Sequence, residues 1–242
     1  MESSSGIMCP FTTPMSKVSI VIPAYNEAST LREIVSRVQA VDIAPHEKEI
    51  IVVDNNSTDD TFAIASSIAG IRVIQESRPG KGAAVRAGFK ASSGDILLIQ
   101  DADLEYDPLD YPALIHPLAV GEADALVGIR KPTKTTGHLW SFLYYLGNTA
   151  ITLATNVLYG GTASEYTGGY KVFTKQAVAG ITVRTHDFAY EHELVCKVLK
   201  KKLRLVHIPI RYYPRDYSEG KKINWKDGFR ILGAVIKYRF VD

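Results

Sequence analysis

Short apolar segments alternate with helix-like segments from residue 18 onward, and this alternation limits the possible folds more than any other feature. The predicted strands cover residues 18–22, 49–53, 71–75 and 96–100. An alternation of strands and helices is typical of a parallel sheet with right-handed crossover connections. The sequence therefore predicts an α/β fold in which helices flank a mostly parallel central sheet.

Polar residues mark the expected helix boundaries. Thr30 and Glu33 have the spacing of a capping box and predict where the first helix begins. The loop 54–61 is rich in residues that favour a helix N-cap, and we expect a helix from there to Ala69. Later patterns predict helices at 109–120, 139–159, 190–200 and 224–240, and strands at 123–127, 168–173 and 203–213.

Length, charge and cysteine content narrow the class of protein. The 242 residues fit one large domain, and a net charge of +2 excludes a nucleic-acid binder that relies on bulk charge. Cys9 and Cys196 lie far apart without metal-ligand spacing, which fits a reducing cytoplasmic compartment. Residues 1–16 are polar and turn-rich and lack the pattern of a signal peptide, so we expect a flexible arm there.

Carboxylates directly follow the most apolar predicted strand. Ile96–Ile99 is an unbroken apolar run, typical of a strand buried on both faces, and Asp101, Asp103 and Glu105 come just after it. Ligands bind at the carboxyl ends of parallel strands. Carboxylate oxygens also suit Mg²⁺, which completes its shell with water and substrate phosphates. The alternative is an ordinary solvated acidic turn.

Two other strands end in polar loops, one containing Glu27 and one beginning at Asp54. Because the carboxyl ends of parallel strands lie at the same edge of a sheet, these loops and the Asp101–Asp103 loop should converge. The sequence therefore predicts a nucleotide site. The Gly80-Lys81-Gly82 turn opens a further helix and is expected to act beside the phosphates or as a lid.

Several motifs together resemble family-2 glycosyltransferases, which have the GT-A fold with a Rossmann-like central sheet. They are Val18–Glu27, Val53–Thr61, Gly80–Gly82 and Asp101–Asp103. Later segments are similar to the polyprenyl-phosphate branch, typified by dolichyl-phosphate mannosyltransferase: Gly128–Arg130, Gly169–Phe173, and Arg215 with Ser218 and Lys221. The resemblance implies a GT-A domain over 17–242. Its part 17–130 would bind the nucleotide sugar, and 131–242 would be a C-terminal extension facing the acceptor and the membrane.

The resemblance also implies roles for single residues. Contacts to the nucleotide sugar are implied for Pro23, Tyr25, Glu27, Asp54, Lys81, Asp101, Ala102, Asp103, Arg130, Arg215 and Lys221. The implied ligands of Mg²⁺ or Mn²⁺ are Asp101, Asp103 and Glu105, and the implied catalytic residues are Asp103, Arg215 and Lys221. Glu105 stands where the family often has Gln, and Glu165 where it commonly has Asp. Near Gly168 and Gly169 the family often has Cys.

The implied activity is inverting, metal-dependent transfer of a hexose from a nucleotide sugar to dolichyl or undecaprenyl phosphate. GDP-mannose is the favoured donor, ahead of UDP-glucose. A phosphate monoester has a second pKa of about 6, so such an acceptor is an anion that needs no general base. Glu191 and Glu193 are the candidate bases for a hydroxyl acceptor; otherwise they would cap or solvate a helix. A transferase acting on a polysaccharide or another hydroxyl, and a non-catalytic nucleotide-sugar-binding module, remain alternatives.

Peripheral membrane contact is expected as well, at the cytoplasmic face and with a possible membrane-protein partner. Segment 139–159 carries no charge, yet its many polar residues argue against a transmembrane helix. It is either a core helix or an interfacial helix. The last predicted helix carries basic residues that suit anionic headgroups, namely Lys226, Arg230, Lys237 and Arg239. His192 shows no metal-ligand spacing and is expected to be structural or solvated.

Overall fold

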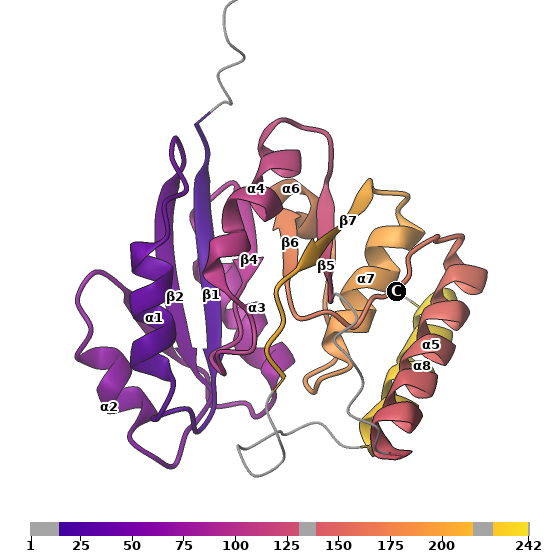
Figure 1. Ribbon diagram of the computed structural model, residues 1–242, viewed down its shortest axis with the longest axis horizontal. Helices are drawn as coiled ribbons and strands as arrows, with labels where there is room; N and C mark the ends of the chain where they lie inside the picture. Colours follow the sequence, from indigo (N-terminus) through magenta and orange to yellow (C-terminus); the bar gives the residue numbers. More distant parts are fainter. Residues whose placement is uncertain (1–14, 131–138, 215–224, 242) are drawn as a thin grey trace, which may run out of the picture.

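The computed structural model describes residues 15–130, 139–214 and 225–241, with backbone alone for 139–145 and 225–227. Strands and helices alternate along the chain (Figure 1). The first elements are β1 (Lys17–Ala24), α1 (Leu31–Ala40), β2 (Glu47–Asp54), α2 (Thr61–Ser66), β3 (Arg72–Gln75), α3 (Lys81–Ala91) and β4 (Ile96–Ile99). Then follow η1 (Pro108–Asp110), α4 (Tyr111–Ala119), β5 (Ala125–Arg130), α5 (Leu139–Tyr159), β6 (Lys171–Thr174), α6 (Lys175–Ala179), α7 (Tyr190–Lys200), β7 (Leu205–Ile210) and α8 (Trp225–Phe240).

The described strands form one sheet in the order β3-β2-β1-β4-β6-β5-β7. Every neighbouring pair is parallel except those that involve β6, which runs antiparallel to both β4 and β5. The mostly parallel α/β architecture predicted from the sequence is confirmed. The carboxyl ends of β1, β2 and β4 therefore lie together at one edge of the sheet.

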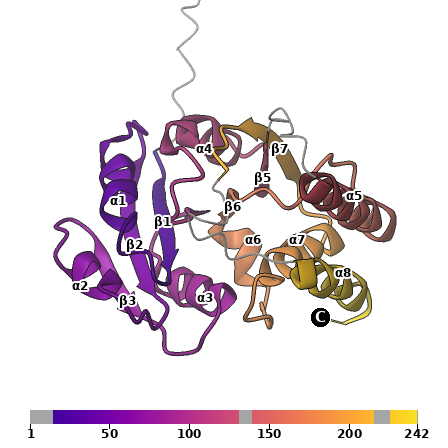
Figure 2. The ribbon, with the colours of Figure 1, turned by 60° about the horizontal axis from the view of Figure 1, so that its bottom comes forward.

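Helices cover both faces of this sheet (Figure 2). Ile20 and Ile22 of β1 join a core cluster with the apolar sides of α1 and α4. Val21, between them, points to the other face and packs against Ala84 of α3. A Cβ on Gly88 would collide with Val21, so α3 approaches β1 closely because this position is glycine. The alternation along β1 thus buries it on both faces, as its apolar run predicts.

Some local predictions are wrong. Thr30 makes no side-chain cap bond at the start of α1; its hydroxyl donates instead to the Glu27 carboxylate at 2.9 Å, so the capping box does not form. Helix α2 ends at Ser66 rather than at Ala69. The sequence also did not predict the short helix α6, which begins immediately after β6 where the Thr174 side chain accepts from the Ala177 N–H.

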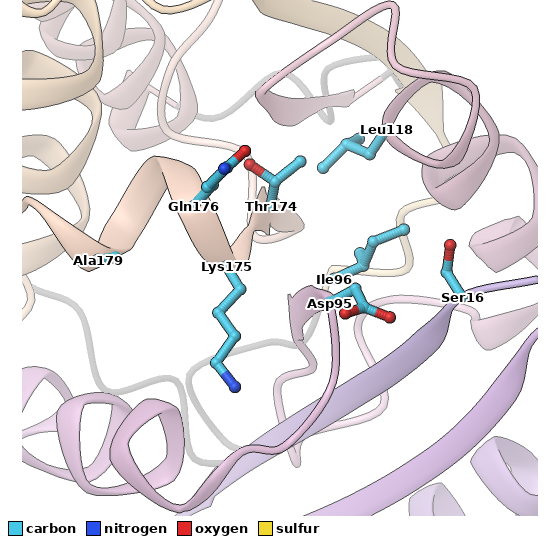
Figure 3. Close-up of a pocket in the computed structure, with 8 residues that line it drawn as sticks. All are labelled: Ser16, Asp95, Ile96, Leu118, Thr174, Lys175, Gln176 and Ala179. Carbon is cyan, nitrogen blue, oxygen red and sulfur yellow. The ribbon is translucent and has the colours of Figure 1, made fainter.

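A cavity of about 470 Å³ opens at the opposite edge of the sheet, near the start of β4 and the end of β6 (Figure 3). Its lining residues are Ser16, Asp95, Ile96, Leu118, Thr174, Lys175, Gln176 and Ala179. None of these is a predicted site residue. Across the described ranges, no helix combines the length and apolar character needed to cross a bilayer.

Candidate active site

The loops after β1 and β2 are joined by hydrogen bonds, which brings the predicted nucleoside contacts together. The backbone N–H of Glu27 donates to the Thr61 hydroxyl at 2.8 Å, and the Thr58 N–H donates to the Asn26 side chain at 2.8 Å. Tyr25 is 47% exposed above this junction, whereas Glu27 and Asp54 are buried. Within the described part of the chain, Asp54 Oδ1 has no hydrogen-bond partner. A buried acceptor of this kind is suited to a donor group on a ligand.

The acidic loop after β4 is held in a tight turn. Leu104 lies in the left-handed region with φ of +64°, and the Glu105 N–H donates to Asp103 Oδ1 at 3.1 Å. The Glu105 carbonyl in turn accepts from the Tyr213 N–H at 2.9 Å, which ties the loop to the segment after β7. Ala102 is buried beneath the loop. The turn therefore fixes the Asp103 carboxylate at the carboxyl end of β4.

A polar and aromatic layer that the sequence analysis missed supports this loop. Gln100 accepts from the hydroxyls of Tyr111 and Tyr170 at 2.7 and 2.8 Å, and the Tyr106 hydroxyl accepts from the Gly169 N–H at 3.0 Å. Tyr212 stacks against Tyr106 with ring centroids 5.4 Å apart. One signal was available: Gln100 is a polar residue at the end of an otherwise apolar strand, and a buried amide needs partners.

Lys81 joins the acidic loop to α7 through a chain of alternating charges. Its Nζ lies 2.7 Å from Asp101 Oδ1 and 2.8 Å from Glu191 Oε1. The other oxygen of Glu191 accepts from Lys171 Nζ at 2.6 Å, and Lys171 also donates to the Gly168 carbonyl. We call Lys171, Glu191, Lys81 and Asp101 the buried charge chain. It connects the start of α3, the end of β4, α7 and β6.

The two glutamates of α7 do not cap or solvate the helix, so that expectation is wrong. Burial alone would raise the pKa of Glu191, but the ammonium groups of Lys171 and Lys81 lower it to about 2. Glu193 is fully buried, accepts from the Thr185 N–H at 2.7 Å and pairs with Lys197 at 2.7 Å. A carboxylate with so low a pKa is a poor proton acceptor, which counts against Glu191 as a general base.

Arg130 ends β5 at the same edge of the sheet but is already engaged. Its Nε donates to Glu165 Oε1 at 2.8 Å, its backbone N–H donates to Oε2 at 3.0 Å, and its guanidinium lies over the Tyr212 ring at 5.1 Å. The Thr167 hydroxyl also donates to Glu165 at 2.7 Å. A phosphate that binds Arg130 must therefore compete with Glu165 for the guanidinium.

The remaining predicted residues have different outcomes. Arg215, Ser218 and Lys221 lie outside the described residues. Within the described ranges, no group of three or more His, Cys, Asp or Glu side chains is arranged to hold a metal ion. Asp101, Asp103 and Glu105 thus do not form a ready three-ligand site, and Asp101 is paired with Lys81.

His192 stands between the two glutamates of α7 in the sequence, and its side chain is buried. Both of its ring nitrogens lack hydrogen-bond partners among the described residues. Burial, followed by the Lys171 charge, lowers the pKa of His192 to about 4, although Glu191 opposes the shift. Below about pH 6.5 the imidazole is protonated in the unfolded chain, whereas in the folded protein it stays neutral down to about pH 4. The free energy of unfolding should therefore fall as the pH drops from about 6.5 to about 4, by on the order of 3 kcal/mol.

Urea unfolding across that pH range should show a shallower loss of stability for His192→Gln than for the unsubstituted protein, because glutamine does not titrate. Parallel pH profiles for the two proteins would contradict the assignment of this titration to His192.

Comparison with known proteins places this geometry in a family. The model described as glycosyl transferase family 2 matches residues 19–181, which include the loops after β1, β2 and β4. The chain belongs to glycosyl transferase family 2. This family-2 glycosyltransferase therefore carries Asp54, Lys81, Asp101 and Asp103 inside the matched region, whereas Glu191 lies beyond it.

Relatives of this family-2 glycosyltransferase include glycosyltransferase AglJ of Haloferax volcanii, 30% identical over 213 residues, with 87% of this chain and 68% of AglJ covered. The dolichol-phosphate mannosyltransferase of Pyrococcus furiosus is 28% identical over 227 residues, with 91% and 63% covered. The chain thus spans about two thirds of their length. The fold is also shared with glucosyl-3-phosphoglycerate synthase of Mycobacterium tuberculosis, which was solved with Mn²⁺, UDP and phosphoglyceric acid. That match has a TM-score of 0.72 and 22% sequence identity, and it covers 94% of this chain and 80% of the synthase chain.

Proposed function

We propose that this family-2 glycosyltransferase moves a hexose from a nucleotide sugar to a polyprenyl phosphate such as dolichyl or undecaprenyl phosphate. The observation that carries the proposal is the position of Glu191, which Lys81 and Lys171 hold as a weakly basic carboxylate. With Glu193 paired to Lys197, neither candidate base suits a hydroxyl acceptor. An acceptor that is already an anion needs no such base.

The donor would lie along the carboxyl edge of the sheet. Pro23, Tyr25 and Glu27 would contact the nucleoside, and the buried Oδ1 of Asp54 would accept from the base or ribose. Mannose from GDP-mannose is our first choice and glucose from UDP-glucose our second. The similarity to the P. furiosus dolichol-phosphate mannosyltransferase supports the lipid-phosphate acceptor and this order.

The carboxylates proposed as metal ligands fit a hard divalent ion that takes its other ligands from water and substrate phosphates. Asp103 and Glu105 would supply carboxylate oxygens, and Mg²⁺ commonly takes one or two carboxylates and completes its shell with water and substrate phosphates. When bound, Mg²⁺ or Mn²⁺ would neutralise charge on the diphosphate. The pairing of Asp101 with Lys81 favours a role for Asp101 beside the ribose or in the outer shell.

In the proposed reaction, an oxygen of the acceptor phosphate forms a bond to the anomeric carbon while the bond from that carbon to the nucleoside diphosphate breaks. Attack from the face opposite the leaving group inverts the anomeric configuration. The electron pair leaves with the diphosphate, so cationic groups beside it lower the barrier. We assign this role to Lys81 at the start of α3, and we assign Arg130, Arg215 and Lys221 to the diphosphate and acceptor phosphate.

Product partitioning tests the acceptor directly. The protein is incubated with Mg²⁺ or Mn²⁺, a polyprenyl phosphate, and radiolabelled GDP-mannose or UDP-glucose, and the product is extracted into organic solvent. Label in the organic phase that depends on the lipid phosphate supports the proposal. Label transferred only to water-soluble saccharides would show a hydroxyl acceptor, and donor binding without turnover would show a binding module. Either outcome would refute the proposed acceptor.

A further inference from the structure

Glu165 holds Arg130 with both of its carboxylate oxygens. The Arg130 backbone N–H donates to Oε2 at 3.0 Å, its Nε donates to Oε1 at 2.8 Å, and its Nη2 donates to the same Oε1. The side chain of Glu165 is only 8% exposed, whereas that of Arg130 is 27% exposed. The guanidinium is therefore accessible to a ligand, while the carboxylate is shielded from water.

Two further side chains surround the same carboxylate. The Thr167 hydroxyl donates to Glu165 Oε1 at 2.7 Å, and the side-chain amide of Asn148, on α5, donates to it at 3.3 Å. The two side chains also contact each other, with Thr167 Oγ1 2.6 Å from Asn148 Oδ1. If the guanidinium moves away, Glu165 therefore keeps three donors: the Arg130 backbone N–H, the hydroxyl and the amide. We call Thr167 and Asn148 the carboxylate cap.

The environment of the buried carboxylate decides how easily the guanidinium can be released. Removing the partner of a buried charge is strongly destabilising when the charge is left without compensation. A carboxylate that accepts two or three hydrogen bonds is stabilised in its ionised form. The carboxylate cap therefore lowers the free-energy cost of moving Arg130 to a phosphate. Glu165 itself acts in the opposite direction, because an anion that binds the guanidinium must compete with it.

We infer that the Arg130 guanidinium is exchanged from Glu165 to a phosphate of the substrate, and that Thr167 and Asn148 are positioning residues for this exchange. The inference rests on the proposed function in one respect, the assignment of Arg130 to the diphosphate or the acceptor phosphate. A phosphate monoester carries more than one negative charge near neutral pH, so it attracts the guanidinium more strongly than a single carboxylate does. Helix α5 thereby takes part in phosphate binding through Asn148.

A fixed pair is the alternative arrangement. Arg130 would then stay on Glu165 and present its remaining N–H groups to the substrate, so Glu165 would support phosphate binding rather than oppose it. The two arrangements predict opposite effects for Glu165→Gln. Glutamine keeps the length of the side chain and an oxygen that can accept from Arg130, but it loses the negative charge that competes with a phosphate.

Titration calorimetry measures the exchange without any turnover. The probes are GDP and UDP, each with Mn²⁺, and inorganic phosphate; Arg130→Gln identifies the probe that Arg130 binds as the one whose affinity it lowers. Glu165→Gln should tighten binding of that probe by about fivefold, because a charge-assisted hydrogen bond to the guanidinium becomes a weaker neutral one. Thr167→Val and Asn148→Ala should each weaken it by about threefold to fivefold, because a buried Glu165 with fewer donors holds Arg130 more firmly.

Asn156→Ala and Thr155→Val are the matched controls on α5. The Asn156 amide donates to the Ala163 carbonyl at 2.9 Å, and the Thr155 hydroxyl donates to the Ile151 carbonyl at 2.8 Å. Each control loses a hydrogen bond of the same kind as a cap variant does, but none of these bonds involves Arg130. Both controls should therefore leave the affinity for the probe unchanged. Thermal unfolding of every variant is measured alongside.

Weaker binding of the probe to a folded Glu165→Gln variant would indicate a fixed pair and overturn the inference. Unchanged binding to both Thr167→Val and Asn148→Ala would also overturn it, and this comparison decides even if Glu165→Gln does not fold. If Arg130→Gln binds every probe as tightly as the unsubstituted protein, the assignment of Arg130 to a phosphate is refuted and the exchange with it. The expected affinities without transfer to a polyprenyl phosphate would refute only the proposed acceptor.

Discussion

Replacing Asp103 with asparagine should lower the rate of glycosyl transfer by on the order of 100- to 1000-fold while leaving the fold intact. The loop that carries Asp103 is shaped by backbone interactions of its neighbours, including the left-handed Leu104 and the hydrogen bond that the Tyr213 N–H donates to the Glu105 carbonyl. Asparagine keeps the size of the side chain and an oxygen that can accept from the Glu105 N–H. It loses the negative charge that a divalent ion requires. Initial rates at saturating donor and a series of Mn²⁺ concentrations measure the loss.

The same strand offers a matched control. Asp95 precedes β4 as Asp103 follows it, and its carboxylate accepts from the Lys17 N–H at 3.1 Å at the opposite edge of the sheet. Asp95 lines the cavity there (Figure 3), and none of the lining residues is a predicted site residue. Asp95→Asn should therefore keep the transfer rate. Equal rates for the Asp103→Asn variant and the unsubstituted enzyme would exclude Asp103 from the reaction.

Glu191→Gln should lower kcat/KM by about tenfold to 100-fold, because small displacements of a positioning group cost that much. In the folded protein Glu191 holds Lys81 from one side while Asp101 holds it from the other. Without the carboxylate, Lys171 and Lys81 become two buried cations that repel each other, and Lys81 is drawn toward Asp101. We also expect a loss of stability of about 3 kcal/mol, so activity must be measured well below the unfolding temperature of the variant.

Glu193→Gln separates positioning from stability. Glu193 lies on the same helix, is also buried and pairs with Lys197, but it faces the loop at 184–185 rather than the buried charge chain. Its substitution should destabilise the protein by a similar amount with little change in kcat/KM.

Because Glu191 acts through Lys81, adding Glu191→Gln to Lys81→Met should cause no further loss of activity. Additive losses in that double variant would show that Glu191 does not act through Lys81.

Periodicity along the chain predicted much of this fold correctly. The bounds expected for two helices, 139–159 and 190–200, are those of α5 and α7. The convergence of the loops after β1, β2 and β4 followed from parallel winding alone, since parallel strands place their carboxyl ends at one edge. The antiparallel course of β6 between β4 and β5 could not be predicted in this way, because a strand's own residues do not specify its neighbours.

In the candidate site, too, local motifs predicted some residues, and the tertiary structure alone revealed their partners. Motifs within single loops predicted Asp54, Lys81, Asp101 and Asp103 as site residues, and the partner that Lys81 finds in α7 comes from a distant segment. Lys81 and Glu191 are 110 residues apart, and no local pattern connects them. The expectation that Glu191 would be solvated failed for this reason: an isolated glutamate near a helix start is usually exposed, and only the arrival of two lysines makes its burial tolerable.

By itself, the amino-acid sequence determined the layered α/β architecture and the acidic edge, because apolar spacing decides which residues can be buried and where each strand must end. Only the tertiary structure decided which charges neutralise one another and which side of α5 is covered. Packing against α7 and α8 buries Ile151 and leaves Leu153 and Val157 exposed. Helix α5 is therefore a core helix on one side and an exposed apolar helix on the other, a distinction that depends on its neighbours in space.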